Sequence, residues 1–440
     1  AGVDCSDNEV NIKIALAGAK RGDRLTEDDR VKLLSAMTDE VGAIVLEDNR
    51  LQALALSIAT AGGAATTASH LRLIETLEAS GQLDRKTEGL AESDVLARRA
   101  AEGQGLTRPE LAVVLSSAKL VLQDALEHSS VPDDPLLEGE LLAAFPAPMR
   151  IEFKADILEH RLRREIIATK LANRMVNRLG LIHPFELVEE EGATLAQVTT
   201  AFVAAEQLLG MGAIWQGIES RPMPEVARIL LFDRAAAAMV NHMADLLRIS
   251  GGALAAGELV GQLEGGVALL SAATGRLLSH EGQALSTTLR ERFVAAGAPA
   301  DLAAAVAHLF DLDGSVGLAM LARQTGTKPE ALTRAFVALG HELGLDWAQQ
   351  AAERLSPTDP WERLLVNSLA RDIQHMRLEF LRRHAADNGE PLAVVERWID
   401  GQAAAIRQFQ DVVARAQAAP SLSPTMLAQI GNQARNLLAR

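Results

Sequence analysis

The sequence predicts an all-α protein made of many packed helices, and three observations support this class. Hydrophobic residues make up 48% of the 440 residues, whereas aromatic residues make up only 3%. A core rich in Ala and Leu and poor in aromatic and β-branched residues favours closely packed helices over sheets. Helix-capping signals recur along the chain, each followed by apolar residues three or four positions apart, and no convincing run of alternating strand residues occurs.

Three residue pairs have the spacing of a capping box. In this motif a Ser or Thr and an acidic residue three positions later satisfy each other's backbone N–H groups at the start of a helix. The pairs are Ser6 with Glu9, Thr26 with Asp29, and Thr107 with Glu110. The first pair predicts a helix that begins near Asp7, and the other two predict helices that begin just after their Thr.

The stretch "PMRIEFKADILEHRLRREIIATKLANRMVNRLG" predicts one long helix over residues 148–179. Pro148 stands where a helix begins and Gly180 where one ends. At 1.5 Å per residue such a helix is roughly 47 Å long. It carries eight Lys or Arg against four acidic residues. We interpret these charges as a solvated face with ion pairs one turn apart, the alternative being a surface for an acidic partner or a phosphate.

Two stretches of the chain repeat each other, which predicts a duplicated helical unit. Residues 198–247 resemble residues 332–381, with matching residue types at offsets between 132 and 135. The matching pairs are Phe202 with Phe336, Trp215 with Trp347, Arg228 with Arg363, and His242 with His375. The large apolar members are interpreted as core residues, because such side chains on helix faces are most often buried.

Composition and motifs exclude several classes of function. The net charge of −15 argues against a nucleic-acid surface, which needs a basic face. No apolar run reaches the roughly 18–20 residues that cross a bilayer. A single cysteine, Cys5, excludes an intrachain disulfide framework and fits a reducing, cytoplasmic setting. No zinc-binding HExxH, nucleophile GxSxG, P-loop or complete dinucleotide fingerprint occurs, so we expect no metal site and no complete catalytic site in these residues.

Four stretches give the chain a resemblance to a known family, the large-subunit class of bacterial NAD-specific glutamate dehydrogenases. Together they cover much of residues 1–190, and the helical remainder is similar to the C-terminal end of that family. The stretches are "AGVDCSDNEVNIKI", "MTDEVGAIVLEDNRLQALALS", "LTRPELAVVLSSAKL" and "LRREIIATKLANRMVNRLG".

The resemblance implies three regions. Residues 1–60 would be the closing helices of an α/β catalytic domain whose nucleotide-binding strands lie upstream. Residues 61–195 would form a helical region that includes the long helix, and residues 196–440 a helical C-terminal region with the two related units. The full enzyme would oxidise L-glutamate with NAD to 2-oxoglutarate and ammonium, as a homo-oligomer. Its catalytic Lys and Asp and most of its NAD contacts would lie upstream.

The same resemblance implies two substrate-binding residues. Glutamate dehydrogenases have a Gly-Val-x-x-Ser stretch whose Val and Ser line the pocket for the substrate side chain, and here those positions are Gly2, Val3 and Ser6. A Ser at a helix N-terminus can present its hydroxyl and free N–H groups to a carboxylate. The alternative is that Ser6 only caps its own helix.

A second interpretation of the whole chain remains open at this point, namely a non-enzymatic helical scaffold or protein-interaction module. A strand–GxGxxG–helix unit and a catalytic Lys upstream of Ala1 would favour the enzyme. Their absence from the upstream sequence would favour the scaffold.

Overall fold

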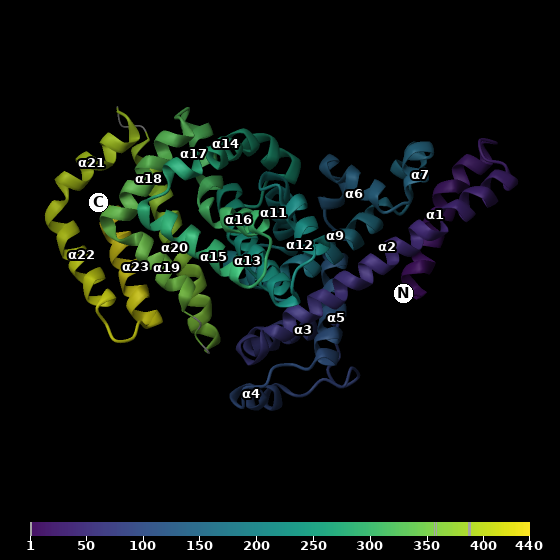
Figure 1. Cartoon of the computed structure of the whole chain (residues 1–440), viewed down its shortest axis with the longest axis horizontal. Helices are drawn as coiled ribbons and strands as arrows, with labels where there is room; N and C mark the ends of the chain where they lie inside the picture. Colours follow the sequence, from purple (N-terminus) through teal and green to yellow (C-terminus); the bar gives the residue numbers. More distant parts are fainter. Residues whose placement is uncertain (1, 356, 358, 386–388) are drawn as a thin grey trace. The chain divides into compact units, whose positions relative to one another are not determined.

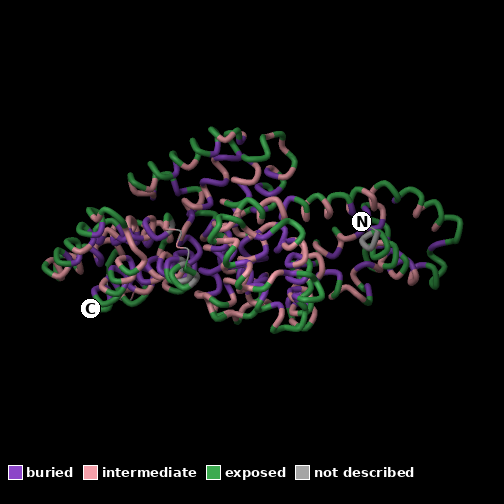
Figure 2. The backbone as a smooth tube through the Cα atoms, turned by 90° about the horizontal axis from the view of Figure 1, so that it is seen from below, coloured by how far each residue is buried: buried purple, intermediate pink, exposed green. Residues whose placement is uncertain are grey.

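The computed structural model describes residues 2–355, 357, 359–385 and 389–440, and the side chains within them except those of residues 2–4, 353, 360, 363, 364 and 367. Within these residues the secondary structure consists of α-helices and three short 3-10 helices, with no strand. The all-α prediction is therefore confirmed. In Figure 2 buried and exposed stretches alternate along the helices, as amphipathic helices around a core require.

The chain forms two compact units, which are described separately. Unit 1 comprises residues 1–186, 194–200 and 255–257, and unit 2 comprises residues 187–193, 201–254 and 258–440. Because α10, α11 and α14 each contain residues of both units, the chain passes from one unit to the other within these helices. The predicted borders of the three regions, near residues 60 and 195, remain predictions.

The elements up to α10 lie in unit 1, apart from the end of α10. They are α1 (Gly2–Arg21), α2 (Glu27–Ala61), η1 (Gly63–Thr66), α3 (Thr67–Ala79), α4 (Ser93–Ala101), α5 (Arg108–Glu127), η2 (Val131–Asp133), η3 (Pro135–Leu137), α6 (Glu138–Ala143), α7 (Ala147–Glu152), α8 (Lys154–Leu158), α9 (Arg163–Leu179) and α10 (His183–Glu191).

The elements from α11 on lie in unit 2, apart from the first residues of α11 and α14. They are α11 (Leu195–Leu208), α12 (Met211–Ser220), α13 (Glu225–Ser250), α14 (Ala256–Leu277), α15 (His280–Ala295), α16 (Ala300–Asp311), α17 (Ser315–Thr325), α18 (Pro329–Leu343), α19 (Leu345–Arg354), α20 (Pro360–His384), α21 (Pro391–Gly401), α22 (Ala403–Gln417) and α23 (Pro424–Leu438).

Two of the three predicted helix starts are confirmed. The hydroxyl of Thr26 accepts a hydrogen bond from the backbone N–H of Asp29 at 3.1 Å and caps α2. Thr107 and Glu110 form a reciprocal capping box at the start of α5, and the Glu110 carboxylate accepts from the Thr107 N–H at 2.7 Å. Each cap satisfies N–H groups that have no partner inside the helix, which fixes where α2 and α5 begin.

The core of unit 1 is built around the packed pair α5 and α9, with α2 against both. The buried residues of α5 recur three or four positions apart and face a similar stripe on α9. They include Leu111, Val114, Leu115, Ala118 and Leu122 on α5, and Ile166, Ile167, Leu171 and Met175 on α9. This spacing puts all of them on one side of each helix, which explains why these two helices pack together.

The prediction of one continuous helix over residues 148–179 is wrong, because the segment forms α7, α8 and α9. The backbone leaves the helical conformation at Phe153, with φ −116° and ψ 28°, and again before Arg163. Near the second break the ring Nδ1 of His160 accepts from the backbone N–H of Leu162 at 3.1 Å. This side chain competes with the helical hydrogen-bond pattern, while the ring Nε2 lies 3.1 Å from the Asn11 carbonyl oxygen.

Three basic side chains of α9 bind carboxylates on other elements. Lys170 lies 3.3 Å from Asp48 of α2, and Arg174 pairs with Glu140 of α6. Arg164 forms a similar ion pair with a carboxylate of η2. For these three side chains the interpretation as pairs one turn apart is wrong, because their charges tie α9 to the elements around it.

Unit 2 is organised around α20, which contacts α13, α17, α18, α19 and α23 (Figure 1). Its residues Ile373 and Phe380 are completely buried and belong to an apolar cluster to which α14 and the helices from α17 to α23 contribute. The helices α21, α22 and α23 close this cluster, and α22 packs against both of its neighbours in the chain.

Three consecutive helices recur in unit 2 in the same order. Helices α11, α12 and α13 have 14, 10 and 26 residues, and α18, α19 and α20 have 15, 10 and 25. In each set a left-handed glycine precedes the middle helix, Gly210 with φ 62° and Gly344 with φ 64°. The lengths and the glycine turn support the predicted duplication, and the superposition of the two units remains a prediction.

Among the described residues, no single helix is long and apolar enough to cross a membrane. Two bent pairs, α11 with α12 and α16 with α17, reach the required length and composition when each is counted as one segment.

Candidate functional site

The predicted substrate-binding residues lie on α1. This helix begins at Gly2, so Ser6 stands inside it, exposed, and the prediction of a helix start near Asp7 is wrong. Glu9 pairs with Lys13 one turn later instead of closing a capping box. The backbone N–H of Ser6 therefore belongs to the helical hydrogen-bond pattern and is not free for a ligand. The side chain of Val3 lies outside the described residues.

No group of three or more His, Cys, Asp or Glu among the described residues has a geometry that could hold a metal ion. The lone thiol, Cys5, is exposed on α1.

The described part of the chain does not fit NAD. The pyrophosphate of a dinucleotide is bound where a β-strand passes through a glycine-rich turn into a helix. The described residues form helices only, so this strand–turn–helix unit is not among them. Residues 103–105 (Gly-Gln-Gly) lie between α4 and α5, and residues 210–212 (Gly-Met-Gly) comprise the turn before α12 and its first two residues, so neither glycine pair follows a strand.

A buried ionic cluster joins α10, α13 and α20 inside unit 2. Arg371 pairs with Glu190, and its guanidinium lies 3.5 Å from Glu191. Arg248 lies 2.7 Å from the other oxygen of Glu191. The side chains of Glu190 and Glu191 are 2% and 6% exposed, so their charges are nearly removed from water. Because each of the two acids has an Arg partner, we interpret this cluster as structural rather than catalytic.

One carboxyl beside this cluster has a strongly shifted pKa. Asp245 of α13 accepts a hydrogen bond from Nε2 of Gln374 of α20 at 2.7 Å. Burial raises the pKa of Asp245 to about 7, although the charges of Arg248 and Arg371 lower it. Such a group could move a proton near neutral pH, but in this setting its immediate effect is on folding stability.

Unit 2 also contains a partly open cavity of about 510 Å³ lined by residues of α13 to α20. Four arginines line it, and the guanidiniums of two of them lie over aromatic rings: that of Arg377 is 4.1 Å from the centre of Phe336, and that of Arg234 is 4.7 Å from the centre of Phe310. The hydroxyl of Ser315, also in the lining, is buried without a hydrogen-bond partner. The cavity therefore combines apolar walls with a few converging polar groups, as ligand sites do.

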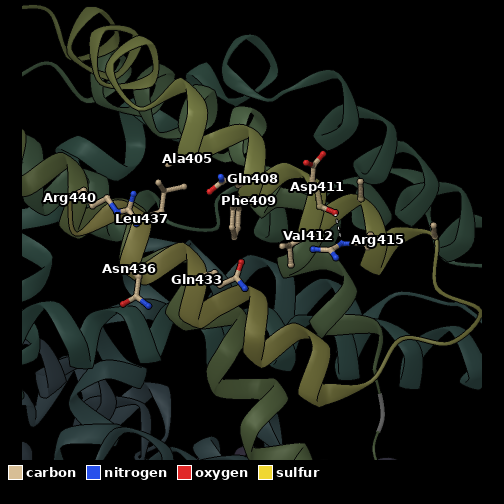
Figure 3. Close-up of a pocket in the computed structure, with 12 residues that line it drawn as sticks. Ala405, Gln408, Phe409, Asp411, Val412, Arg415, Gln433, Asn436, Leu437 and Arg440 are labelled. Atoms are coloured by element: carbon tan, nitrogen blue, oxygen red, sulfur yellow. Dashed lines mark hydrogen bonds between the residues drawn. The ribbon is translucent and has the colours of Figure 1, made fainter.

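A wide groove of about 930 Å³ runs along α22 and α23 (Figure 3). Figure 3 shows Gln408, Asp411 and Arg415 on one helix and Gln433 and Asn436 on the other. The Arg415 Nε donates to the backbone carbonyl of Asp411 at 3.2 Å, which is a contact within its own helix. The groove is open, and among the described residues no buried unpaired polar group lies in its lining. The cavity lined by α13 to α20 is therefore the better candidate for a ligand site.

Sequence reasoning did not find the cavity. Its polar residues are spread from residue 234 to residue 377 and form no motif, so only the folded chain brings them together. The sequence holds one local signal, because the Gly of "DLDGS" at residues 311–315 is typical of a turn that ends a helix. In the structure α16 ends there at Asp311, Gly314 has φ 80°, and α17 begins at Ser315 in the cavity wall.

Two known protein families match this chain. Residues 103–435 match the family described as glutamate dehydrogenase, C-terminal, and residues 1–59 match the family described as bacterial NAD-glutamate dehydrogenase, catalytic domain. The NAD-specific glutamate dehydrogenase of Halomonas elongata is 33% identical over 414 residues, which covers 90% of this chain and 25% of that protein.

Two further relatives carry the same name. The protein of Pseudomonas aeruginosa is 34% identical over 374 residues, covering 84% of this chain and 23% of its own length. The protein of Mycobacterium tuberculosis is 30% identical over 380 residues, covering 85% of this chain and 23% of its own length. The chain thus spans about a quarter of the length of these curated relatives. The interpretation as an unrelated helical scaffold is not favoured, and the chain belongs to the family of glutamate dehydrogenase C-terminal regions.

Proposed function

We propose that this chain is the C-terminal part of an NAD-dependent glutamate dehydrogenase. The whole protein would oxidatively deaminate L-glutamate to 2-oxoglutarate and ammonium while NAD is reduced. One observation supports this most strongly: residues 1–59 match a catalytic domain and residues 103–435 match the C-terminal region of the same enzyme class, in one chain. The names of the three relatives agree with it.

In this proposal NAD is bound mainly by segments outside these 440 residues, since the described residues contain no strand–turn–helix unit. The helical units would support the structure of the catalytic domain, the assembly of a homo-oligomer, or regulation. We also propose a cytoplasmic location, which the single exposed cysteine and the absence of disulfides among the described residues favour.

The first test measures NADH formation from L-glutamate and NAD with two purified proteins, the full-length protein and this 440-residue chain. We expect the full-length protein to form NADH and the chain alone to form none, because hydride transfer needs cofactor and substrate held together. A full-length protein that folds but forms no NADH would refute the proposal. Activity of the isolated chain would refute the assignment of NAD binding to other segments.

We further propose that Val3 and Ser6 contact the substrate side chain. The structure changes how this can be tested, because Ser6 is exposed within α1 and does not cap it. Ser6→Ala should therefore leave the melting temperature unchanged. If the hydroxyl binds the glutamate carboxylate, its loss removes a bond to a charged group worth about 1.5–3 kcal/mol, which raises the KM for glutamate roughly ten- to hundredfold.

The matched control is Ser35→Ala, since Ser35 is likewise exposed within a helix, α2. It should change neither KM nor stability. An unchanged KM in Ser6→Ala would remove Ser6 from the substrate site while leaving the proposed activity intact.

A further inference from the structure

The cavity in unit 2 has the size and the wall of a small-molecule site. Its volume of about 510 Å³ falls within the range of roughly 300–1,000 Å³ that is typical of ligand pockets. Much of its lining is aliphatic, supplied by α14, α15, α17 and α18. These residues are Leu270, Leu277, Leu285, Leu289, Leu318 and Val337.

Arg377 of α20 is the most buried charged group in the lining, with only 3% of its surface exposed. Its guanidinium donates to Oδ1 of Asp346 and to Oε1 of Gln349, each at 2.7 Å. Its third donor, Nε, is buried without a partner. A buried donor without a partner costs about 1–3 kcal/mol, so an acceptor in the cavity would stabilise this arrangement.

Arg234 of α13 supplies a second cation. Its guanidinium lies over Phe310, and its Nε is also buried without a hydrogen-bond partner. Among the described residues, no carboxylate lies within ion-pair distance of Arg234. Its charge is therefore available to an anion that enters the cavity.

Ser315 brings a third donor, at the first turn of α17. The residue is 4% exposed and its hydroxyl has no partner. No side chain caps α17, so the positive end of the helix is uncompensated there. A Cβ on Gly314 would lie 3.4 Å from Cζ of Phe336, the ring that also carries Arg377. This contact places the start of α17 close to the buried arginine.

The acidic groups of the lining are already engaged. Asp346 pairs with Arg377 at 2.7 Å, and Asp311 accepts from the hydroxyl of Ser286 at 2.9 Å. Asp313 interacts electrostatically with Arg377. Among the described residues, the buried lining groups that lack a partner are thus able to donate: Nε of Arg234, Nε of Arg377 and the hydroxyl of Ser315. Two of them belong to cations, which favours an anionic ligand.

We propose that this cavity binds a small organic monocarboxylate, with the carboxylate toward Arg234, Arg377 and Ser315 and an aliphatic body against the leucine wall. The walls exclude a purely inorganic anion as the best ligand, because they would leave its hydrated faces against hydrocarbon. This inference goes beyond the proposed dehydrogenase activity and does not depend on it.

The test uses isothermal titration of the 440-residue chain with three molecules of one shape. Isocaproate carries the carboxylate, whereas isohexanol and isohexylamine replace it with a neutral and a cationic group. We expect isocaproate to bind at least tenfold more tightly than either analogue. Equal binding of the alcohol, or no binding of isocaproate, would overturn the proposal.

Variants then locate the bound carboxylate. Among the described residues, Arg234 takes part in no ion pair and the hydroxyl of Ser315 has no partner. Arg234→Gln should therefore lose only the contact with the Phe310 ring, and Ser315→Ala should keep the melting temperature. We expect isocaproate affinity to fall at least tenfold in Arg234→Gln and severalfold in Ser315→Ala. The control, Arg276→Gln, changes an exposed arginine of α14 outside the lining and should bind normally. Unchanged affinity in both cavity variants would overturn the proposal, and if Arg234→Gln fails to fold, Ser315→Ala decides.

Discussion

The two helical triplets of unit 2, α11–α13 and α18–α20, share their helix lengths and their glycine turn but differ in what they bury. Trp215 of α12 is completely buried, stacks on Phe232 with ring centres 5.3 Å apart, and donates to Glu206 at 3.1 Å. Trp347 of α19 is only partly buried and packs at the edge of the apolar cluster. The same residue type thus fills the core in one triplet and covers it in the other.

The difference has a geometric cause. Trp215 is the fifth residue of α12, whereas Trp347 is the third residue of α19. Two positions on an α-helix correspond to a rotation of about 200°, so the two indoles leave their helices on opposite sides. The two tryptophans therefore occupy different positions counted from the shared glycine, whereas Phe202 and Phe336 both lie eight positions before it and both are buried. Whether the tryptophans superpose remains a prediction.

The third helices of the two triplets, α13 and α20, also place matching residues in different surroundings. His242 of α13 is completely buried, with Nε2 3.0 Å from the carbonyl oxygen of Leu309. His375 of α20 is 41% exposed and lies 3.9 Å from Glu379. The backbone framework of the two triplets is thus more alike than the surroundings of their side chains, which is what divergence after a duplication would produce.

The largest expected effect comes from truncating the two tryptophans. Trp215→Ala should lower the free energy of unfolding by about 3–5 kcal/mol, because it removes a fully buried ring and leaves a cavity. Trp347→Ala should lower it by only about 1–2 kcal/mol, since part of that ring is already in water. Urea denaturation of both variants measures the difference, and equal losses would mean that the two triplets bury their tryptophans alike.

The second expected effect is a pH dependence of folding stability. It arises at the contact between the two triplets, where Asp245 of α13 meets Gln374 of α20. Burial raises the pKa of Asp245 to about 7, above the value of about 3.9 in an unfolded chain. As pH rises from about 4 to about 7, the unfolded state releases a proton that the folded state keeps. Folding stability therefore falls across this window and stays at the lower level above it.

Asp245→Asn keeps a side-chain oxygen that can accept the hydrogen bond from Gln374, but the amide group cannot ionise. The free energy of unfolding of this variant, relative to that of the original chain, should grow from pH 4 to pH 7 by at most about 4 kcal/mol. Urea unfolding at several pH values measures this, with Asp233→Asn, an exposed change on the same helix, as the control. Parallel stability profiles for Asp245→Asn and the original chain would show that the pKa of this carboxyl is not raised in the fold.

How much of this was readable from the sequence depends on whether a feature is local. The caps at Thr26 and Thr107 were predicted because both partners lie within one turn. The second break of the expected long helix was not, because it lies where His160 reaches Asn11 of α1, 149 residues away in the chain. The same holds for the candidate ligand cavity, whose donors Arg234, Ser315 and Arg377 meet only after eight helices have packed.

The smallest effect concerns the glycine turns that the triplets share. Gly210 and Gly344 both have positive φ, so an alanine at either position adopts a left-handed conformation that costs about 1–2 kcal/mol. A Cβ at Gly210 meets nothing within 4 Å, whereas one at Gly344 lies 3.2 Å from Cγ1 of Val413. We expect Gly344→Ala to destabilise more than Gly210→Ala, because it adds a steric contact to the same backbone strain.

Two further variants separate strain from crowding. Gly212→Ala, within α12 and with no atom near the new Cβ, should raise the free energy of unfolding by up to about 1 kcal/mol, since its backbone is already helical. In a chain that already carries Val413→Ala, Gly344→Ala should lower the free energy of unfolding by as much as Gly210→Ala does. The crowding methyl is then gone, while the left-handed backbone remains. A glycine effect at position 344 that is unchanged by the loss of Val413 would mean that the two turns differ in backbone strain itself.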